Sequence, residues 1–301
     1  MPGRHERRQI GHHLVVELRV GCPMWRHRSW TGRYLPRGAQ PSEDLAAYAT
    51  WCTAVEGNTT FYALPDPGTV ERWRDATPER FRFLFKVPRA ITHDRRLRDS
   101  DELLAEFCDR IRPLGSRVGP ISIQLPGSFG PRDLPDLEEF LALVPDDLPW
   151  SVEVRHPELH EPGPAQQRLN DLLHDRGSDR VVLDTRALFA GPWRTAAEIE
   201  AWERKPRLPV RPVVTGNRPV VRFIGQTEAD ANPEYWAPWV ERVSRWLHES
   251  KEPTVFVHTP DNAISPDLAR RFHAEVTALQ PTLRPLPVPL PLDDQVRMFD
   301  P

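Results

Sequence analysis

The sequence predicts an α/β protein, a single-domain TIM-like (β/α)₈ barrel, and three observations support this prediction. Short apolar runs with alternating polar residues recur about every 30 to 40 residues, which is the pattern of strands. Helical patterns lie between these runs, and alternating strands and helices form parallel sheets with right-handed crossovers. Eight such units in about 265 residues fit the usual size of a closed barrel, about 250 residues.

Each predicted strand has one apolar face and one polar face. Seven runs carry one or two charged, amide or imidazole side chains at alternate positions, and successive side chains of a strand point to opposite faces. An eighth run, 16–21, precedes them. The seven runs lie at 55–58, 83–86, 121–124, 152–155, 182–184, 221–223 and 255–258.

Stripes of apolar residues at helical spacing follow the strands. Asp66 and Pro67 form a good cap and first turn for a helix that has Val70 and Trp73 on its inner face. The longest stripe, 235–247, is rich in tryptophan and is expected to pack on the barrel or on a second subunit, so the oligomeric state stays open. The remaining stripes lie at 103–111, 137–144, 169–173 and 268–279.

A doubly wound open sheet is the main alternative architecture. Its central strands would be buried on both faces and apolar throughout, whereas the strands of this chain alternate. No glycine-rich GxGxxG motif or P-loop follows the first strand, which also disfavours a nucleotide-binding open sheet. A barrel with a polar interior near its top therefore fits the pattern better.

The composition indicates an ordinary globular protein with no bulk attraction to polyanions. Hydrophobic residues make up 39% and charged residues 28% of the chain, and the net charge is -3. This charge disfavours nucleic acid or an anionic membrane as a partner, and no apolar run approaches the roughly 20 residues that span a bilayer. The chain has three widely spaced cysteines without a CxxC motif, and it lacks the apolar core of a signal peptide. Both features predict a cytoplasmic location.

The chain is predicted to divide into a barrel and two terminal segments. Residues 1–13 are basic and polar and are expected to be flexible, and residues 14–280 are expected to form the barrel. Residues 281–301 are rich in proline, which excludes a helix or a central strand, so this tail is expected to run extended over the surface. A proline- and arginine-rich stretch at 204–209 is expected to be a long surface loop.

Strings along most of the chain resemble one known family. The string VEGNTTFY at 55–62 is followed by TVERW at 69–73, FRFLFKVP at 81–88 and ITH at 91–93. QLP at 124–126, EVRHP at 153–157, LDTR at 183–186, RFIG at 222–225 and HTPD at 258–261 come later in the same order. Together they resemble the YecE-like family, known as domain of unknown function 72, over roughly residues 20–279. This resemblance implies a TIM-like barrel and leaves the chemistry open.

Two positions place the resemblance in the YecE branch of that family. The string GCPMW at 21–25 is similar to the Gly-x-Pro-x-Trp opening of the branch, where many other members carry Gly-x-Ser-Gly-Trp. Those members also tend to have asparagine where this chain has His258.

The polar strand ends predict an active site, because barrels of this type carry theirs at the C-terminal ends of the strands. Glu153 is the first candidate for a general acid or base, with Glu56 as its partner carboxylate. Lys86 is expected to clamp an anion or to form a Schiff base. The expected substrate-binding residues are Trp25, Asn58, Tyr62, Gln124, Arg155, Asp184, Arg222 and His258.

These residues predict an enzyme that uses acid–base chemistry on a small polar or anionic substrate, without a cofactor. A non-catalytic ligand-binding barrel is one alternative, and a buried salt-bridge network that only closes the barrel is another. A third alternative is a metal-dependent hydrolase or isomerase. The positive charges of Lys86, Arg155 and Arg222 among the same residues disfavour it, because they would repel a metal cation. Its divalent ion would be held by Glu56, Glu153, Asp184 and His258.

Nucleic acid is another class of binding partner that the sequence can be tested for. It is also the substrate that the metal-dependent alternative would act on if that enzyme were a nuclease. Basic clusters lie at 95–98 and 204–211, and aromatic residues are available for stacking on bases. The negative net charge opposes this function, and arginine-rich loops usually face solvent. We therefore expect a small molecule rather than a nucleic acid.

Overall fold

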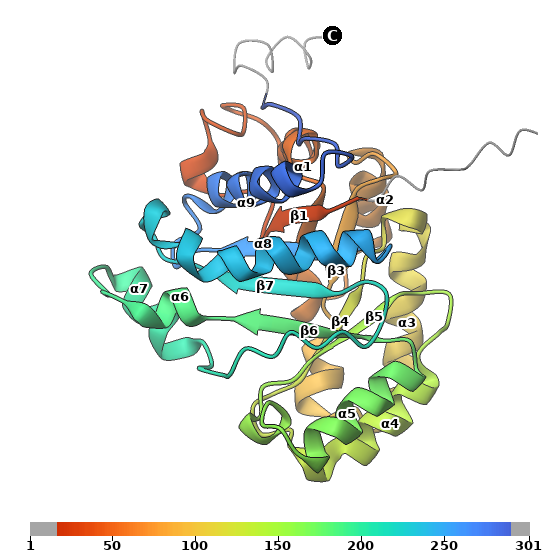
Figure 1. Cartoon of the computed structure of the whole chain (residues 1–301). Coiled ribbons are helices and arrows are strands. Elements are labelled where there is room, and N and C mark those ends of the chain that lie inside the picture. The colour runs from red at the N-terminus through yellow and green to blue at the C-terminus, as the bar shows by residue number, and fades with distance from the viewer. Residues whose placement is uncertain (1–16, 290–301) are drawn as a thin grey trace, which may run out of the picture.

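The computed structural model describes residues 17–289, in which eight parallel strands form a barrel with helices around it (Figure 1). The strands are β1 (Arg19–Cys22), β2 (Ala54–Gly57), β3 (Arg82–Phe85), β4 (Ile121–Gln124), β5 (Trp150–Glu153), β6 (Asp179–Asp184), β7 (Val220–Ile224) and β8 (Thr254–His258). The main helices are α1 (Pro41–Trp51), α2 (Pro67–Asp75), α3 (Asp101–Ile111), α4 (Leu134–Leu143), α5 (Pro164–Asp175), α6 (Arg186–Ala190), α7 (Ala196–Arg204), α8 (Pro233–His248) and α9 (Ser265–Leu279).

The strands follow one another around the barrel in the order β3-β2-β1-β8-β7-β6-β5-β4, and every pair is parallel. The two end strands, β3 and β4, meet through isolated bridges that pair Phe83 with Val118 and Lys86 with Ser122. The Val87 N–H also donates to the Ser122 carbonyl oxygen at 3.0 Å. The predicted barrel is therefore confirmed, and its wall is nearly closed between β3 and β4.

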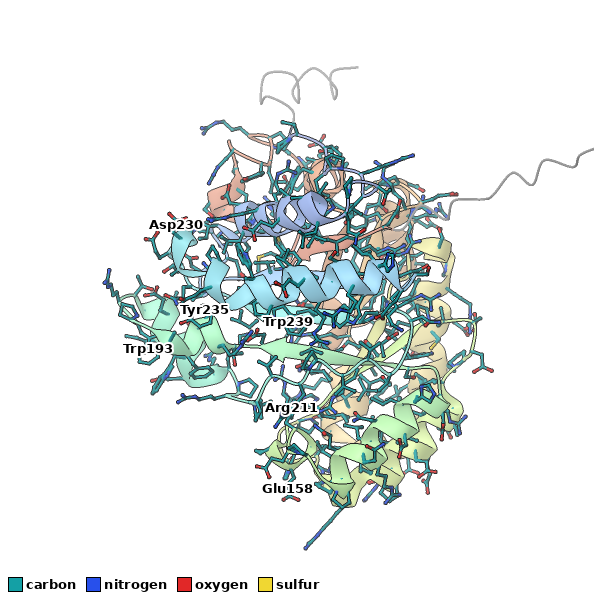
Figure 2. The ribbon with its side chains drawn as sticks, viewed as in Figure 1. Glu158, Trp193, Arg211, Asp230, Tyr235 and Trp239 are labelled. Carbon is teal, nitrogen blue, oxygen red and sulfur yellow. The ribbon has the colours of Figure 1, made fainter. Side chains whose placement is uncertain are left out.

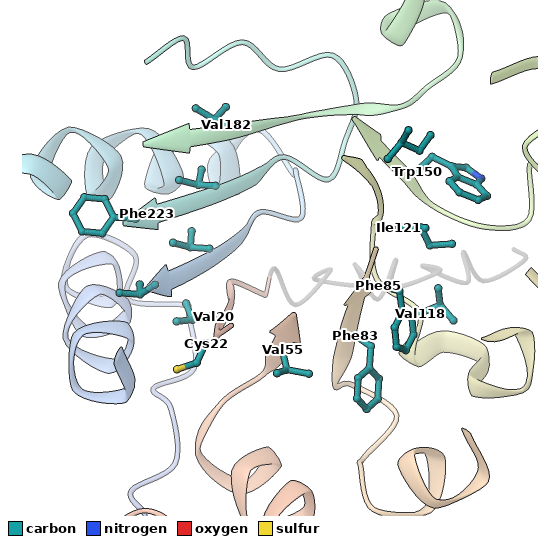
Figure 3. Close-up of a cluster of buried hydrophobic side chains, with 14 of the residues drawn as sticks. Val20, Cys22, Val55, Phe83, Phe85, Val118, Ile121, Trp150, Val182 and Phe223 are labelled. Carbon is teal, nitrogen blue, oxygen red and sulfur yellow. The ribbon is translucent and has the colours of Figure 1, made fainter. Parts of the chain in front are cut away.

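The outer faces of the strands pack against the helices. Val20, Val55, Phe83 and Val182 point away from the barrel axis (Figure 3) and are buried in the main hydrophobic core. Helix α8 contributes to this core through Trp236, Trp239, Val240 and Val243, and the ring centroid of Trp236 lies 5.8 Å from that of Phe223 on β7. The tryptophan-rich stripe at 235–247 thus packs on the barrel rather than presenting its apolar face for a second subunit.

The barrel interior has an apolar layer below a charged layer. Strand side chains alternate, so the residue two positions further along a strand points to the same face, closer to the C-terminal end. On four strands an interior apolar residue is followed in this way by a polar one: Ala54 by Glu56, Leu84 by Lys86, Val220 by Arg222 and Phe256 by His258. Ala54, Leu84, Val181, Val220 and Phe256 form a hydrophobic cluster of their own.

The local elements differ from the expectation in three places. The first strand starts at Arg19, so residues 17 and 18 of the expected run 16–21 do not belong to it. Helix α1 was not predicted, because its buried residues lie on more than one side and leave no single stripe. Helices α6 and α7 were also not predicted, since α6 has five residues and α7 leaves Ile199 and Trp202 exposed. The loop 205–219 that follows α7 contains no helix or strand, so the loop expected at 204–209 begins at 205, and Arg204 is the last residue of α7.

The described ends of the chain contain neither helix nor strand. The part of the proline-rich tail that the structure describes, 281–289, contains no helix or strand, and Leu283 is buried against the core. The expected flexible segment 1–13 and the remainder of the tail lie outside the described residues. No helix within 17–289 combines the length and the apolar character that a membrane crossing requires.

Candidate active site

Arg222 on β7 links two buried carboxylates across the barrel. Its Nε donates to Oε1 of Glu56 on β2 at 2.6 Å, and its Nη1 donates to Oε2 of Glu153 on β5 at 2.7 Å. Glu56 is 1% exposed, Glu153 0% and Arg222 3%. All three charges are therefore removed from water together, which requires the mutual pairing and hydrogen bonds that the structure has here.

Neighbouring side chains bind the remaining carboxylate oxygens. Arg155 Nε donates to Glu153 Oε1 at 2.8 Å, and Asn58 Nδ2 donates to Glu56 Oε2 at 3.2 Å. His258 Nε2 lies 3.0 Å from Glu56 Oε1. Burial lowers the pKa of His258 to about 4, so its imidazole is neutral at pH 7 and donates a proton to this hydrogen bond. We call the set Glu56, Lys86, Glu153, Arg155, Lys205, Arg222 and His258 the charged layer.

Both carboxylates of the charged layer are held ionised. Burial by itself would raise the pKa of Glu153, but Arg222 and Arg155 outweigh it and hold this pKa well below its usual value. Arg222 and His258 lower the pKa of Glu56 in the same way. A carboxylate in this state has no proton to donate at neutral pH and is a weak base. The electrostatics therefore count against the acid–base role expected for Glu153 and Glu56.

Lys86 follows β3 and is the amine best placed for proton transfer. It is 9% exposed, and no carboxylate oxygen within the described residues lies within 4.0 Å of its Nζ, which stands 6.0 Å from the centroid of the Phe61 ring. Burial and, next, the charge of Arg222 lower the pKa of Lys86 to about 7. Neutral and charged forms are thus both populated near pH 7.

Lys205 is a second amine of the charged layer, and sequence reasoning missed it. It lies at the start of the loop 205–219, where burial and the charge of Arg222 lower its pKa to about 8, while Glu56 opposes this shift. It was overlooked because it stands in an arginine-rich stretch interpreted as surface. A signal was nevertheless present, since only three of the 40 Lys and Arg residues are lysines, namely Lys86, Lys205 and Lys251.

Two amide side chains beside the charged layer keep unused hydrogen-bonding groups. Gln124 at the end of β4 is 6% exposed, and its Oε1 has no hydrogen-bond partner within residues 17–289. Oδ1 of Asn58 is likewise buried without a partner there. An unpaired buried polar atom costs about 1–3 kcal/mol, so both oxygens are suited to accept from a ligand hydroxyl or amine. Tyr62 lies outside this set, 81% exposed beside Phe61.

Asp184 does not join the charged layer, contrary to the expectation. Val182, two residues earlier on β6, points outward (Figure 3), and the same alternation turns Asp184 outward. There its Oδ2 accepts from Arg186 Nη2 and from Trp239 Nε1, each at 2.7 Å, and Trp239 lies between α8 and β6 (Figure 2). The short run 182–184 holds a single polar residue, so the pattern alone could not assign its face.

Trp25 is also absent from the charged layer. Its ring centroid lies 5.7 Å from that of Trp73 on α2 and 6.5 Å from that of Phe83, whose side chain points outward from β3. Trp25 therefore packs, partly buried, against the hydrophobic core between the barrel wall and a helix.

The expected metal ligands do not converge. Within residues 17–289, no group of three or more His, Cys, Asp or Glu side chains is arranged to hold a metal ion. Glu56 and His258 are in contact, but Arg222 binds Glu56 and Glu153, and Asp184 faces away. The arrangement of these residues therefore does not favour the metal-dependent alternative.

Comparison with known proteins assigns the family. The sequence model of the family described as "Protein of unknown function DUF72" matches residues 19–291. The chain belongs to the DUF72 family. It is 39% identical over 268 residues to the UPF0759 protein YecE of Escherichia coli strain K12, which covers 89% of this chain and 96% of that protein. The counterpart in Escherichia coli O157:H7 matches with the same identity and coverage, so the resemblance to the YecE branch is confirmed.

Solved DUF72 structures share the fold. A DUF72 family protein of Enterococcus faecalis has a TM-score of 0.63 and 22% identity, with 85% of this chain and 97% of that chain covered. A DUF72 family protein of Thermotoga maritima has a TM-score of 0.60 and 20% identity, with 88% and 98% covered. At these identities the likeness establishes the barrel alone. The chemistry of this DUF72 protein must therefore be argued from its own residues.

Proposed function

We propose that this protein is an enzyme that binds a small anionic, hydroxyl-bearing substrate at the C-terminal face of the barrel and uses Lys86 as its acid–base group. The observation that supports this most is the pair of amines, Lys86 and Lys205, beside a carboxylate–arginine network. Within residues 17–289, neither amine has a carboxylate oxygen within 4.0 Å. Two amines at a barrel mouth that make no ion pair among the described residues attract an anion, such as a carboxylate or phosphate group.

The charge balance of the layer supports an anionic ligand. Glu56 and Glu153 contribute two negative charges, and Arg155 and Arg222 offset them through direct contacts. His258 is neutral, because burial lowers its pKa to about 4. Any protonation of Lys86 or Lys205 therefore gives the layer a net positive charge, which an anionic substrate would neutralise.

The choice of lysine over arginine supports a role in proton transfer. This chain uses arginine almost everywhere that a cation is needed, yet two of its three lysines belong to the charged layer. Arginine stays protonated in proteins, whereas a buried lysine can titrate near neutral pH. A position that only needed a fixed positive charge could carry arginine, as Arg155 and Arg222 do.

The unpaired amide oxygens support hydroxyl groups on the substrate. Gln124 Oε1 and Asn58 Oδ1 can each accept a hydrogen bond from a substrate hydroxyl group. The ammonium groups of the two lysines cannot do this, because they only donate hydrogen bonds. A sugar acid or a sugar phosphate combines an anionic group with such donors. The reaction proposed is proton abstraction or donation at such a substrate, with the neutral Lys86 amine as the base.

Matched ligand pairs test the binding part of this proposal. Thermal-shift assays would compare glycerol phosphate with propyl phosphate, gluconate with hexanoate, and glucose as an uncharged polyol, because a ligand of the folded state raises its melting temperature. The hydroxylated anions should stabilise the wild-type protein most. Lys86→Met and Lys205→Met should remove the effect, and Lys251→Met is the matched control. Failure of every anion to bind would refute the proposal.

Solvent exchange tests the chemistry without knowledge of the product. A ligand found in the screen would be incubated in D₂O with the protein, and its proton NMR spectrum would be followed for deuterium incorporation or conversion. Lys86→Arg keeps the positive charge but cannot supply a neutral amine, so it should bind the ligand and fail to exchange it. Binding with no exchange or conversion by the wild-type protein would instead favour the non-catalytic ligand-binding barrel.

A cytoplasmic location remains part of the proposal. The three cysteines are buried free thiols, which suits a reducing compartment. Fractionation of cells that produce the protein would check it.

A further inference from the structure

The N-terminal end of the barrel contains a small cavity that the proposed function does not use. It has a volume of about 20 Å³ and is lined in part by Arg19, Arg82, Arg218, Glu252 and Thr254. The apolar layer of Ala54, Leu84, Val181, Val220 and Phe256 lies between this end and the charged layer. We call this space the Arg19 cavity.

Arg19 is a buried guanidinium with incomplete hydrogen bonding. It is 7% exposed, and its Nε is buried without a hydrogen-bond acceptor within residues 17–289. The nearest carboxylate oxygens are Glu252 Oε2, 3.6 Å from Nη1, and Glu17 Oε2, 3.9 Å from Nη2. Both separations are too long for hydrogen bonds, so these carboxylates offset the charge of Arg19 without satisfying its N–H groups.

Two further guanidinium groups line the same cavity. Arg82 is one of them, and its Nη1 donates to the backbone oxygens of Glu79 and Phe81. Arg218 Nε donates to Glu252 Oε2 at 3.3 Å. Three arginines at this end therefore face Glu17 and Glu252, both partly exposed to water, and the buried Asp179, whose carboxylate accepts from the Arg218 backbone N–H.

We infer that the Arg19 cavity binds one small monovalent inorganic anion of about the size of chloride. A cavity needs about 10–15 Å³ to hold one water-sized particle, so this one can hold a single small ion and is too small to enclose phosphate or a carboxylate metabolite. The anion would accept from Arg19 Nε, the buried N–H group that has no acceptor within residues 17–289. This inference is independent of the proposed function, since it concerns the opposite end of the barrel.

Crystals of the full chain grown in bromide test the inference directly. Bromide replaces chloride in such sites, and its anomalous scattering distinguishes it from water. An anomalous peak within hydrogen-bond distance of Arg19 Nε is the expected result. An ordered water at that place, with no anomalous signal, would overturn the inference.

Solution measurements provide a second test. The melting temperature of the wild-type protein should rise with the logarithm of sodium chloride concentration at constant ionic strength, with sodium methanesulfonate as the bulkier replacement salt. Arg19→Met should weaken the apparent chloride affinity about tenfold or more. Arg82→Met serves if the first variant does not fold, and Arg245→Met, an exposed arginine of α8, is the control. Coincident chloride and methanesulfonate curves for the wild-type protein would contradict the inference.

Discussion

Arg222 Nε and Glu56 Oε1 are 2.6 Å apart although 166 residues separate them in the sequence, and this contact joins strands on different sides of the barrel. Arg222 extends the connection to Glu153 on a third strand. The ion pair therefore ties β2, β5 and β7 together above the apolar layer. Its primary effect is on the shape of the site, because it fixes the carboxylates and leaves the two amines available.

Removal of Arg222 should destabilise the fold strongly. Arg222→Met leaves two buried carboxylates without their main partner, and breaking a buried ion pair in this way costs about 3–5 kcal/mol of unfolding free energy. The triple variant Glu56→Gln, Glu153→Gln, Arg222→Met should recover part of the loss, since neutral amides cost less to bury. Urea unfolding measures both, with Arg245→Met as an exposed control. A loss below about 1 kcal/mol for the single variant would show that the network contributes little.

Stability should fall as the pH falls from 6.5 towards 4, and His258 should cause part of the fall. The pKa of His258 is about 4 in the folded protein and about 6.5 in the unfolded chain. As the pH falls, the unfolded chain therefore takes up this proton before the folded protein does, which lowers the free energy of unfolding. Between pH 6.5 and pH 5 this amounts to roughly 2 kcal/mol. His258→Asn should flatten the curve in this window. An unchanged slope would assign the effect to other groups, such as His273, whose pKa is also lowered to about 4 by burial.

Anion binding at the charged layer should weaken as the pH rises through 7 to 8. Lys86, with a pKa of about 7, loses its charge first, and Lys205, with a pKa of about 8, follows. Calorimetric titration with gluconate, whose carboxylate does not titrate in this range, would measure the affinity. Lys86→Arg should shift the fall to higher pH because arginine stays charged. A pH-independent affinity in the wild-type protein would mean that neither amine contacts the anion.

The contact between Trp239 and Asp184 should contribute measurably to stability. Trp239 Nε1 donates to a buried carboxylate at 2.7 Å, and a hydrogen bond to a charged group contributes about 1.5–3 kcal/mol. Trp239→Phe should therefore lower the unfolding free energy by at least about 1 kcal/mol more than Trp246→Phe. Trp246 is the matched control, because it is a buried tryptophan of the same helix with no indole hydrogen bond among the described residues. Equal losses in the two variants would refute this role.

Periodicity predicted most of the fold and the core of the site. Glu56, Lys86 and Arg222 each follow an interior residue by two positions, so alternation alone places them on one face. Asp184 was misplaced because its run is too short to show which face is which. Lys205 was missed because a loop has no periodicity, and only the tertiary fold brings it to the barrel. The ionisation state of Glu153 depends on Arg222, which lies on a distant strand, so a local sequence pattern cannot reveal it.

The junction between β3 and β4 has a consequence for how a substrate could enter. Every other neighbouring pair of strands forms a regular ladder, whereas this pair is joined by isolated bridges, one of which involves Lys86. Few hydrogen bonds must break there, so the free energy of local opening should be lowest along this line. Transient separation of β3 and β4 at this junction would expose Lys86 while the ion pairs of Arg222 with Glu56 and Glu153 stay intact. Amide hydrogen exchange of Val87, whose N–H bridges to β4, would then be faster than that of amides within β7.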